Sequence, residues 1–296
     1  MDRSKHAREY ALLEEAVTVL FCLVDDAYQQ LNPEGGRYET LKKLSDSEVL
    51  TLALLQQLRG VESERSFFRD AVRFFSHLFP GVVGLTHSSL HRRIRRLRRF
   101  FEPLRRMVLS GLVGNPETLV IDSTLLPVLH PRQVGQSAGF WGAAWVRWGS
   151  FCVYGVKLHL LCATNRIPLS YELTPANVAE VGLTEELLTD AQLFEGEPLA
   201  RRLLGDLAYR SQQLKGSLGE RGVLLVTERA KQRGFRQQVE IALASLKQVL
   251  RLGETLATTL TGLATRIAAK ITAYTYAFLV NRILGRPQGR IKEVWA

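Results

Sequence analysis

The pattern of apolar residues changes near Gly114-Asn115-Pro116, and this change constrains the fold more than any other feature of the sequence. Before it, apolar residues recur at helical spacing, as in residues 46–58. After it, short β-type runs appear, the first of them at residues 118–122. We therefore predict an all-helical region over residues 1–113, followed by an α/β domain over residues 114–296.

The α/β region begins with strands that follow one another directly and then alternates strands with helices. The runs at 151–163 and 167–174 are joined by the turn Thr164-Asn165-Arg166, which indicates a hairpin. Strand-like runs at 199–204 and 223–226 follow, with helical segments between and after them. This order predicts a mixed sheet flanked by helices.

The charge balance indicates the chemistry of the partner. The 296-residue chain carries a formal net charge of +10, and its pI is about 9.8. Much of the excess is arginine, which binds phosphate in a bidentate manner, so we expect a polyanionic partner. The three cysteines show no CxxC spacing, which argues against a disulfide framework or a zinc site and favours the reducing cytoplasm.

Two apolar stretches bear on membrane association. Residues 16–24 are too few to span a bilayer, and the N-terminus lacks the apolar core of a signal peptide. The longer segment 255–284 is interrupted by Arg266, Lys270 and Arg282. We therefore predict that residues 255–284 form a buried helical layer and that the protein has no membrane partner.

The most basic stretch of the chain is SSLHRRIRRLRRFFEPLRR, which begins at Ser88. Residues 88–101 predict a helix whose apolar face contains Leu90, Ile94, Leu97 and Phe101. Because no acid interrupts this helix, we predict that it contacts DNA in a helix-turn-helix-like region; a solvated arginine face or a coiled-coil edge is the alternative. The arginines that would make the contact are Arg92, Arg95, Arg96 and Arg99.

Three carboxylates can converge at one edge of the predicted sheet. Asp122 and Asp206 each end a strand-like apolar run, and a later helix at residues 236–247 can bring Glu240 to the same edge. Such an all-oxygen set favours Mg²⁺ or Mn²⁺. Each aspartate alone could equally form a turn or cap a helix. The apolar stripe expected for the later helix comprises Val239, Leu243, Leu246 and Leu250.

The order Asp122, Asp206, Glu240 resembles the DDE triad of bacterial insertion-sequence transposases. The spacing Arg236-x3-Glu240-x6-Lys247 is similar to the last three letters of the Tyr-Arg-Glu-Lys signature found in one group of that family. Further similarity lies in the motifs Tyr154-Gly155-Val156-Lys157-Leu158-His159, Leu173-Thr174-Pro175-Ala176-Asn177 and Gly205-Asp206-Leu207-Ala208-Tyr209-Arg210-Ser211.

The sequence departs from the family pattern at two positions. Arg233 stands where the signature has its tyrosine, so no role of that tyrosine is carried over. The Asn-x-x-Asp ending that often follows Thr-Pro-Ala-Asn reads Val178-Ala179-Glu180 in this chain. The second departure bears on the surroundings of the triad and leaves the triad itself intact.

The resemblance implies a ribonuclease H-like catalytic domain that cleaves phosphodiesters at insertion-sequence ends and joins the freed 3′-OH to target DNA. It also implies two Mg²⁺ or Mn²⁺ ions, both held by Asp122, with Asp206 and Glu240 each completing the ligands of one ion. Arg236 and Lys247 would clamp DNA phosphates. The expected partner is double-stranded DNA, bound by a homodimer.

Lys157 and His159 are two residues apart on a predicted strand and so point to the same side. We predict a DNA contact for Lys157, whereas His159 could support the site or could be an ordinary core histidine. Two other functions remain open for the chain. One is a DNA-binding regulator with a vestigial nuclease-like domain, and the other is a ribonuclease H-like nuclease that cuts without strand transfer.

Residues 131–149 fit neither the helical nor the strand period, although they contain Trp141, Trp145 and Trp148. An ordered loop beside the active site would allow these rings to stack on DNA bases. A small satellite core made by the three rings is the alternative.

Overall fold

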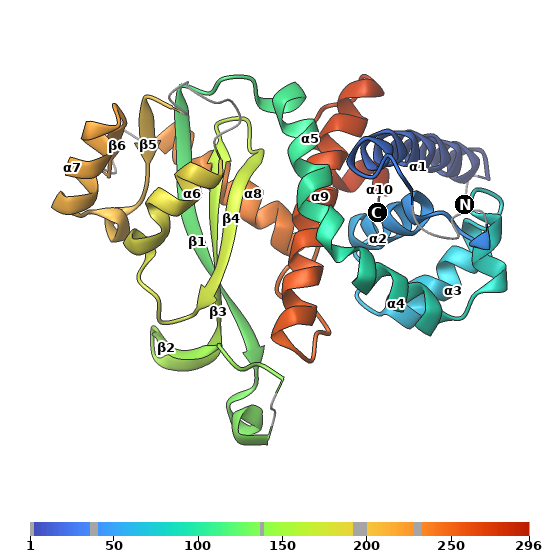
Figure 1. Ribbon diagram of the computed structural model, residues 1–296, viewed down its shortest axis with the longest axis horizontal. Helices are drawn as coiled ribbons and strands as arrows, with labels where there is room; N and C mark the ends of the chain where they lie inside the picture. Colours follow the sequence, from blue (N-terminus) through green and yellow to red (C-terminus); the bar gives the residue numbers. More distant parts are fainter. Residues whose placement is uncertain (1–2, 36–40, 137–138, 192–199, 228–232, 296) are drawn as a thin grey trace. The chain divides into compact units, whose positions relative to one another are not determined.

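The computed structural model describes residues 3–35, 41–136, 139–191, 200–227 and 233–295 (Figure 1). The chain divides into two compact units. Unit 1 comprises Met1–Val108, Gln248–Leu256 and Thr265–Ala296, and unit 2 comprises Leu109–Lys247 and Ala257–Ala264. Residues 265–296, which follow the sheet in the sequence, are thus grouped with the N-terminal helices.

The regular secondary structure in the described residues of unit 1 consists of helices. Its elements are α1 (Arg3–Leu31), α2 (Asp46–Leu58), α3 (Glu64–Phe74), the 3-10 helix η2 (Pro80–Gly84), α4 (His87–Leu97), the 3-10 helix η3 (Arg98–Phe100), the first part of α5 (Phe101–Val113), most of α9 (Leu260–Ile283) and α10 (Lys292–Trp295).

Helix α2 lies in the core of unit 1. A capping box closes its N-terminus, because the Ser45 hydroxyl accepts the Glu48 N–H at 3.0 Å while the Ser45 N–H donates to the Glu48 carboxylate. Every residue of α2 except Glu48 is buried. A helix that is buried on all sides must be enclosed by other elements, so α2 is the helix around which unit 1 packs.

Unit 2 contains a six-stranded mixed sheet. β3 pairs antiparallel with β1 and β4, whereas β5 runs parallel to β1 and β6 runs parallel to β5. This arrangement confirms the predicted ribonuclease H-like mixed sheet flanked by helices. The strands are β1 (Thr118–Leu129), β2 (Ala144–Trp148), β3 (Phe151–Ala163), β4 (Pro168–Pro175), β5 (Arg202–Leu204) and β6 (Leu224–Val226).

The helices of unit 2 follow the strands that they connect. They are η4 (Pro131–Gln136), η5 (Glu180–Leu183), α6 (Thr184–Asp190), η6 (Leu207–Tyr209), α7 (Gln212–Glu220) and α8 (Arg233–Gln248), of which η4, η5 and η6 are 3-10 helices. The predicted apolar stripe of α8 is confirmed, because Val239, Leu243 and Leu246 are buried, as is Leu250 just beyond the helix.

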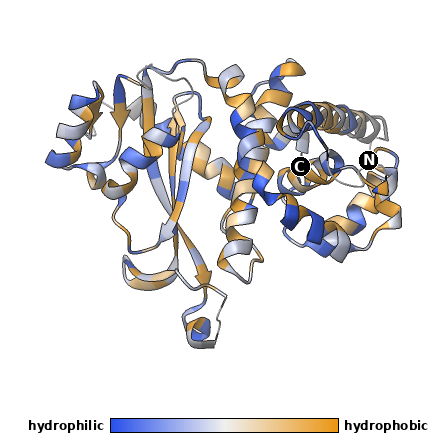
Figure 2. Ribbon diagram, viewed as in Figure 1, coloured by the Kyte–Doolittle hydropathy of each residue, from blue (hydrophilic) through white to orange (hydrophobic). Residues whose placement is uncertain are grey.

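The basic helix is shorter than predicted. α4 ends at Leu97, and a 3-10 turn separates it from α5, so residues 88–101 do not form one continuous helix. Its apolar face is nevertheless as expected, since Leu90, Leu97 and Phe101 are buried. Figure 2 shows α4 as one of the most hydrophilic segments of the chain.

The structure excludes one of the two alternatives for residues 131–149. This stretch forms η4 and then β2, which pairs antiparallel with the first residues of β3. All three tryptophans are exposed, so the satellite core was wrong. Gly155 of β3 lies close to β1, because a Cβ there would collide with the Leu126 carbonyl oxygen.

Candidate functional site

The parallel pairing of β1 with β5 brings two predicted carboxylates to the same level of the sheet. Val120 pairs with Leu204, and Asp122 and Asp206 each follow two residues further along. The backbone of Asp206 stays extended after β5 ends, with φ −79° and ψ −175°. Because neighbouring strands lie about 4.8 Å apart, the two aspartates flank the same point at the end of β5.

Local hydrogen bonds orient both aspartates. Asp122 Oδ1 accepts the Ser123 N–H at 2.8 Å. Asp206 caps η6, and its Oδ1 accepts the Ala208 N–H at 2.8 Å. In each carboxylate the structure thus shows one oxygen held by a neighbouring backbone amide, which fixes the rotamer of the side chain.

Next to Asp206, the backbone of Gly205 is in close contact with the ring of Tyr209. A Cβ on Gly205 would lie 2.9 Å from the Tyr209 ring, so only glycine allows the ring to pack against the backbone at this point. Tyr209 is fully buried as a result. The ring of Tyr209 therefore packs against the backbone next to Asp206.

Glu180 is a third acid near the two aspartates, and in the sequence it differs from other residues only as a departure from the family motif. It opens η5, which contacts η6. Glu180 Oε1 accepts a hydrogen bond from the Ser123 hydroxyl at 2.8 Å and lies 3.2 Å from Lys157 Nζ. Its position after Thr174-Pro175-Ala176-Asn177 was the only sequence signal available.

The charges of three acids act on the hydroxyl of Tyr209. Burial raises the pKa of the Tyr209 hydroxyl far above its usual range, and the negative charges of Glu180, Asp122 and Asp206 raise it further. Tyr209 thus stays protonated at neutral pH.

Lys157 and His159 have internal partners. Lys157 Nζ donates to the Val178 carbonyl at 3.0 Å in addition to its ion pair with Glu180. His159 is fully buried beside the Thr174 hydroxyl, 2.9 Å away, and burial lowers its pKa to about 4. His159 is therefore a neutral core histidine, while the DNA contact of Lys157 stays a prediction.

Helix α8 carries the remaining residues of the predicted triad and clamp. Glu240 and Lys247 are exposed and lie two turns apart, on the same side of the helix. The side chains of Arg233 and Arg236 lie outside the described residues. Within the described part of the chain, no three Asp, Glu, His or Cys residues gather closely enough to hold a metal ion. The structure thus brings Asp122 and Asp206 together, and Glu240 as their partner stays a prediction.

The sequence of this sheet and its carboxylates matches a known family. Residues 114–276, more than half of the chain, match the family model described as the transposase DDE domain. The chain belongs to this family. Its membership makes the protein a DDE transposase and assigns it to a class of enzymes that act on nucleic acid with divalent metal ions.

Comparison with solved structures found three similar chains, all of Mos1. The crystal structure of a pre-cleavage Mos1 transpososome is 11% identical, with 82% of this chain and 78% of that chain covered and a TM-score of 0.36. The Mos1 transposase paired-end complex with left transposon end is 12% identical, with coverages of 81% and 77% and a TM-score of 0.36. A search of curated proteins found no match.

The helical unit of the transposase presents the predicted basic surface. The side chains of Arg92, Arg95, Arg96 and Arg99 are all exposed. Arg95 and Arg96 follow Arg92 by three and four residues, so these three arginines lie on one side of α4. Arg99 follows in η3. Among the described helices, none combines the length and apolar character that crossing a membrane requires.

Arg93 differs from the other arginines of α4 because it anchors the helix. It donates to the Leu44 carbonyl at 2.8 Å and to the Asp46 carboxylate, which also binds Lys42 at 2.7 Å. Burial alone would raise the pKa of Asp46, but the two cations hold it below its usual value. The anchor fixes α4 against the start of α2.

We expect the exposed arginines of α4 to supply phosphate contacts. Changing Arg92, Arg95 and Arg96 to alanine together should weaken binding to duplex DNA and reduce the slope of log Kd against log salt by roughly 3, because each lost phosphate contact removes about 0.9 from the slope. Fluorescence anisotropy over a salt series measures both effects.

A matched control removes the same charge elsewhere. Arg201, Arg202 and Arg221 are exposed in unit 2, and their triple alanine variant has the same net charge as the α4 variant. A similar loss of slope in both variants would show that only net charge matters and that α4 is no specific contact surface.

Helix α4 is thus anchored through Arg93 and packs its apolar side into the core of unit 1. Its other side exposes arginines and contains no acid.

Proposed function

We propose that this transposase cleaves phosphodiesters at insertion-sequence ends and joins the freed 3′-OH to target DNA. The observation that carries the proposal is that Asp122 in β1 and Asp206, two residues beyond the end of the parallel neighbour β5, lie at matching positions. Membership of the DDE family supports the same reading. Two carboxylates that share an edge, with water and phosphate oxygens filling open positions, suit metal-assisted phosphoryl transfer.

The donor set fits hard divalent cations, which we propose to be two Mg²⁺ or Mn²⁺ ions. Asp122 would contact both, and Asp206 and Glu240 would each complete the ligands of one. Such ions, when bound, polarise the phosphate and lower the pKa of the attacking water or hydroxyl. Because Glu240 is exposed on α8, the proposal includes its joining the two aspartates when DNA and metal are present.

The protein groups around the pair have separate tasks. The Ser123 hydroxyl, Glu180 and Lys157 form a chain of polar contacts that holds η5 against β1. Lys157 neutralises Glu180, which limits the repulsion among the acids at this edge. Arg236 and Lys247 would bind the phosphates that flank the scissile bond. Two protomers on DNA would pair the two ends.

The proposal is tested by separating cutting from joining. DNA flanking the gene supplies the end sequence, and two substrates are prepared from it: an intact end and a pre-cut end with a free 3′-OH. With Mg²⁺ and target plasmid, we expect cleavage of the first and joined product from both. Cleavage without joining from either substrate would instead indicate a nuclease that lacks strand transfer.

A further inference from the structure

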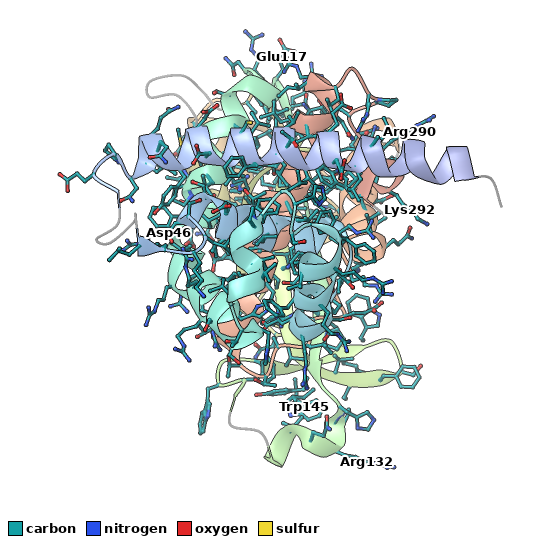
Figure 3. The ribbon with its side chains drawn as sticks, turned by 90° about the vertical axis from the view of Figure 1, so that its right-hand side faces the viewer. Asp46, Glu117, Arg132, Trp145, Arg290 and Lys292 are labelled. Carbon is teal, nitrogen blue, oxygen red and sulfur yellow. The ribbon has the colours of Figure 1, made fainter. Side chains whose placement is uncertain are left out.

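Four aromatic side chains near one end of the sheet are exposed. The exposed fraction is 80% for Trp141, 45% for Trp145, 57% for Trp148 and 74% for Phe151. Trp141 precedes β2, the next two lie on β2, and Phe151 begins β3. We refer to residues 141–154 as the aromatic hairpin. Figure 3 shows Trp145 at the same end of the sheet as Arg132 of η4.

The aromatic hairpin exposes rings on both of its faces. Trp145 pairs with Tyr154, and their ring centroids lie 5.4 Å apart. Trp148 pairs with Phe151 three residues further along β2, which places this pair on the opposite face. An interface with a second protein would normally gather its apolar residues on one continuous face. Rings on two faces are better suited to contact with separate, stacked groups.

The charge of this region indicates an anionic partner. No aspartate or glutamate occurs between Ser123 and Tyr171 in the sequence. Arg147 lies between the two tryptophans of β2, and both Arg147 and Arg132 are exposed. Exposed rings interleaved with cations and free of acids are the features by which proteins bind unpaired nucleic acid, through base stacking and phosphate contact.

We propose that the aromatic hairpin binds unpaired DNA bases by stacking, at a distance from the cleavage site. The proposal rests on the proposed function for the presence of DNA. Leu160 pairs with Asp122, and Tyr154 lies six residues away along β3. At about 3.3 Å per residue, Tyr154 is roughly 20 Å and Phe151 roughly 30 Å along the sheet from Asp122, which corresponds to about six to nine base pairs of duplex. The hairpin would thus bind unpaired bases several base pairs away from the bond that is cut.

The positions of the tryptophans allow DNA binding by the aromatic hairpin to be measured by fluorescence. Trp295, the fourth tryptophan of the chain, is fully buried, so changes in intrinsic tryptophan fluorescence on binding report on the aromatic hairpin. The full-length protein is titrated with an oligothymidine strand, and separately with a fully paired duplex, in EDTA. We expect quenching by the single strand and much less quenching by the duplex.

Substitutions then identify the rings that bind. Trp148→Ala and Phe151→Ala should each weaken oligothymidine binding by roughly 5- to 150-fold, measured by anisotropy, and leave duplex affinity within about twofold. Trp148→Phe keeps a ring and should remain near the original affinity. Leu224→Ala removes an exposed apolar side chain of β6 and serves as the matched control. Retained duplex binding shows that each variant is folded.

Two results would overturn the proposal. One is oligothymidine affinity and fluorescence that are the same in the alanine variants and the original protein. The other is a change of oligomeric state in Trp148→Ala by sedimentation, with single-strand affinity unchanged, which would make the hairpin a contact between copies of the chain. The titrations contain no metal and require no cleavage. Their outcome therefore does not depend on the roles proposed for Asp122 and Asp206.

Discussion

Asp122→Asn and Asp206→Asn should each abolish Mg²⁺-dependent cleavage of the DNA end while the protein remains folded. Loss of one metal-binding carboxylate removes several kcal/mol of transition-state stabilisation, or on the order of 10³-fold in rate. The fold should survive because asparagine keeps the Oδ1 that accepts the Ser123 or Ala208 N–H. End cleavage is measured in single-turnover assays, and folding by circular dichroism and thermal melting.

Three comparisons make this expectation specific. Glu240→Gln should have an effect of the same size if Glu240 joins the pair on DNA. Glu220→Gln, at the exposed end of α7, removes an equal charge from unit 2 and should leave the rate unchanged. DNA affinity in EDTA should be the same in all variants. Full cleavage by either aspartate variant would exclude the carboxylate pair as the metal site.

The carboxylate pair could be predicted from the sequence because its signal is local. An aspartate directly after a buried apolar run is expected at the end of a strand, and parallel neighbours end at the same edge of a sheet. Asp206 follows β5 as expected, whereas Asp122 lies within β1, which continues to Leu129. The register of β1 with β5 nevertheless places the two aspartates at a common level. The same reasoning could not reach Glu180, whose place depends on the contact between η5 and η6.

Two other features lacked a usable sequence signal for physical reasons. β2 is exposed on both faces, so its alternation of Trp, Val and Arg does not separate an apolar from a polar side, and periodicity fails. The end of α4 at Leu97 contains no glycine or proline. Nothing in the local sequence therefore indicated where the basic helix would break.

Among the substitutions considered, breaking a buried ion pair in unit 1 should lower the free energy of unfolding most. Lys270 of α9 is fully buried and donates to Glu62 Oε1 at 2.8 Å and to the Leu250 carbonyl. Burial lowers the pKa of Lys270, and Glu62 opposes that shift. Lys270→Met leaves the Glu62 carboxylate buried without its closest cation, which should cost about 3–5 kcal/mol in the free energy of unfolding. Urea denaturation measures this loss.

A double-mutant cycle tests whether the loss of stability comes from leaving the Glu62 carboxylate without Lys270. The double variant Glu62→Gln/Lys270→Met removes both charges. Its loss in the free energy of unfolding should be smaller than the sum of the losses in the two single variants by about 0.5–3 kcal/mol. Lys292→Met, at an exposed lysine of α10, should change stability by less than about 0.5 kcal/mol. Strictly additive effects would show that the two side chains do not depend on each other.

The same ion pair should influence DNA binding, because its neighbours reach the basic helix. Arg266, one turn before Lys270 on α9, donates to the Glu64 carboxylate at 2.7 Å, and Glu64 also lies 3.3 Å from the ring of His91 in α4. Loss of Lys270 removes the partner that holds Glu62 beside Arg266. We therefore expect Lys270→Met to weaken duplex binding under conditions where the protein is still folded, with the salt slope unchanged, since the phosphate-binding arginines themselves remain.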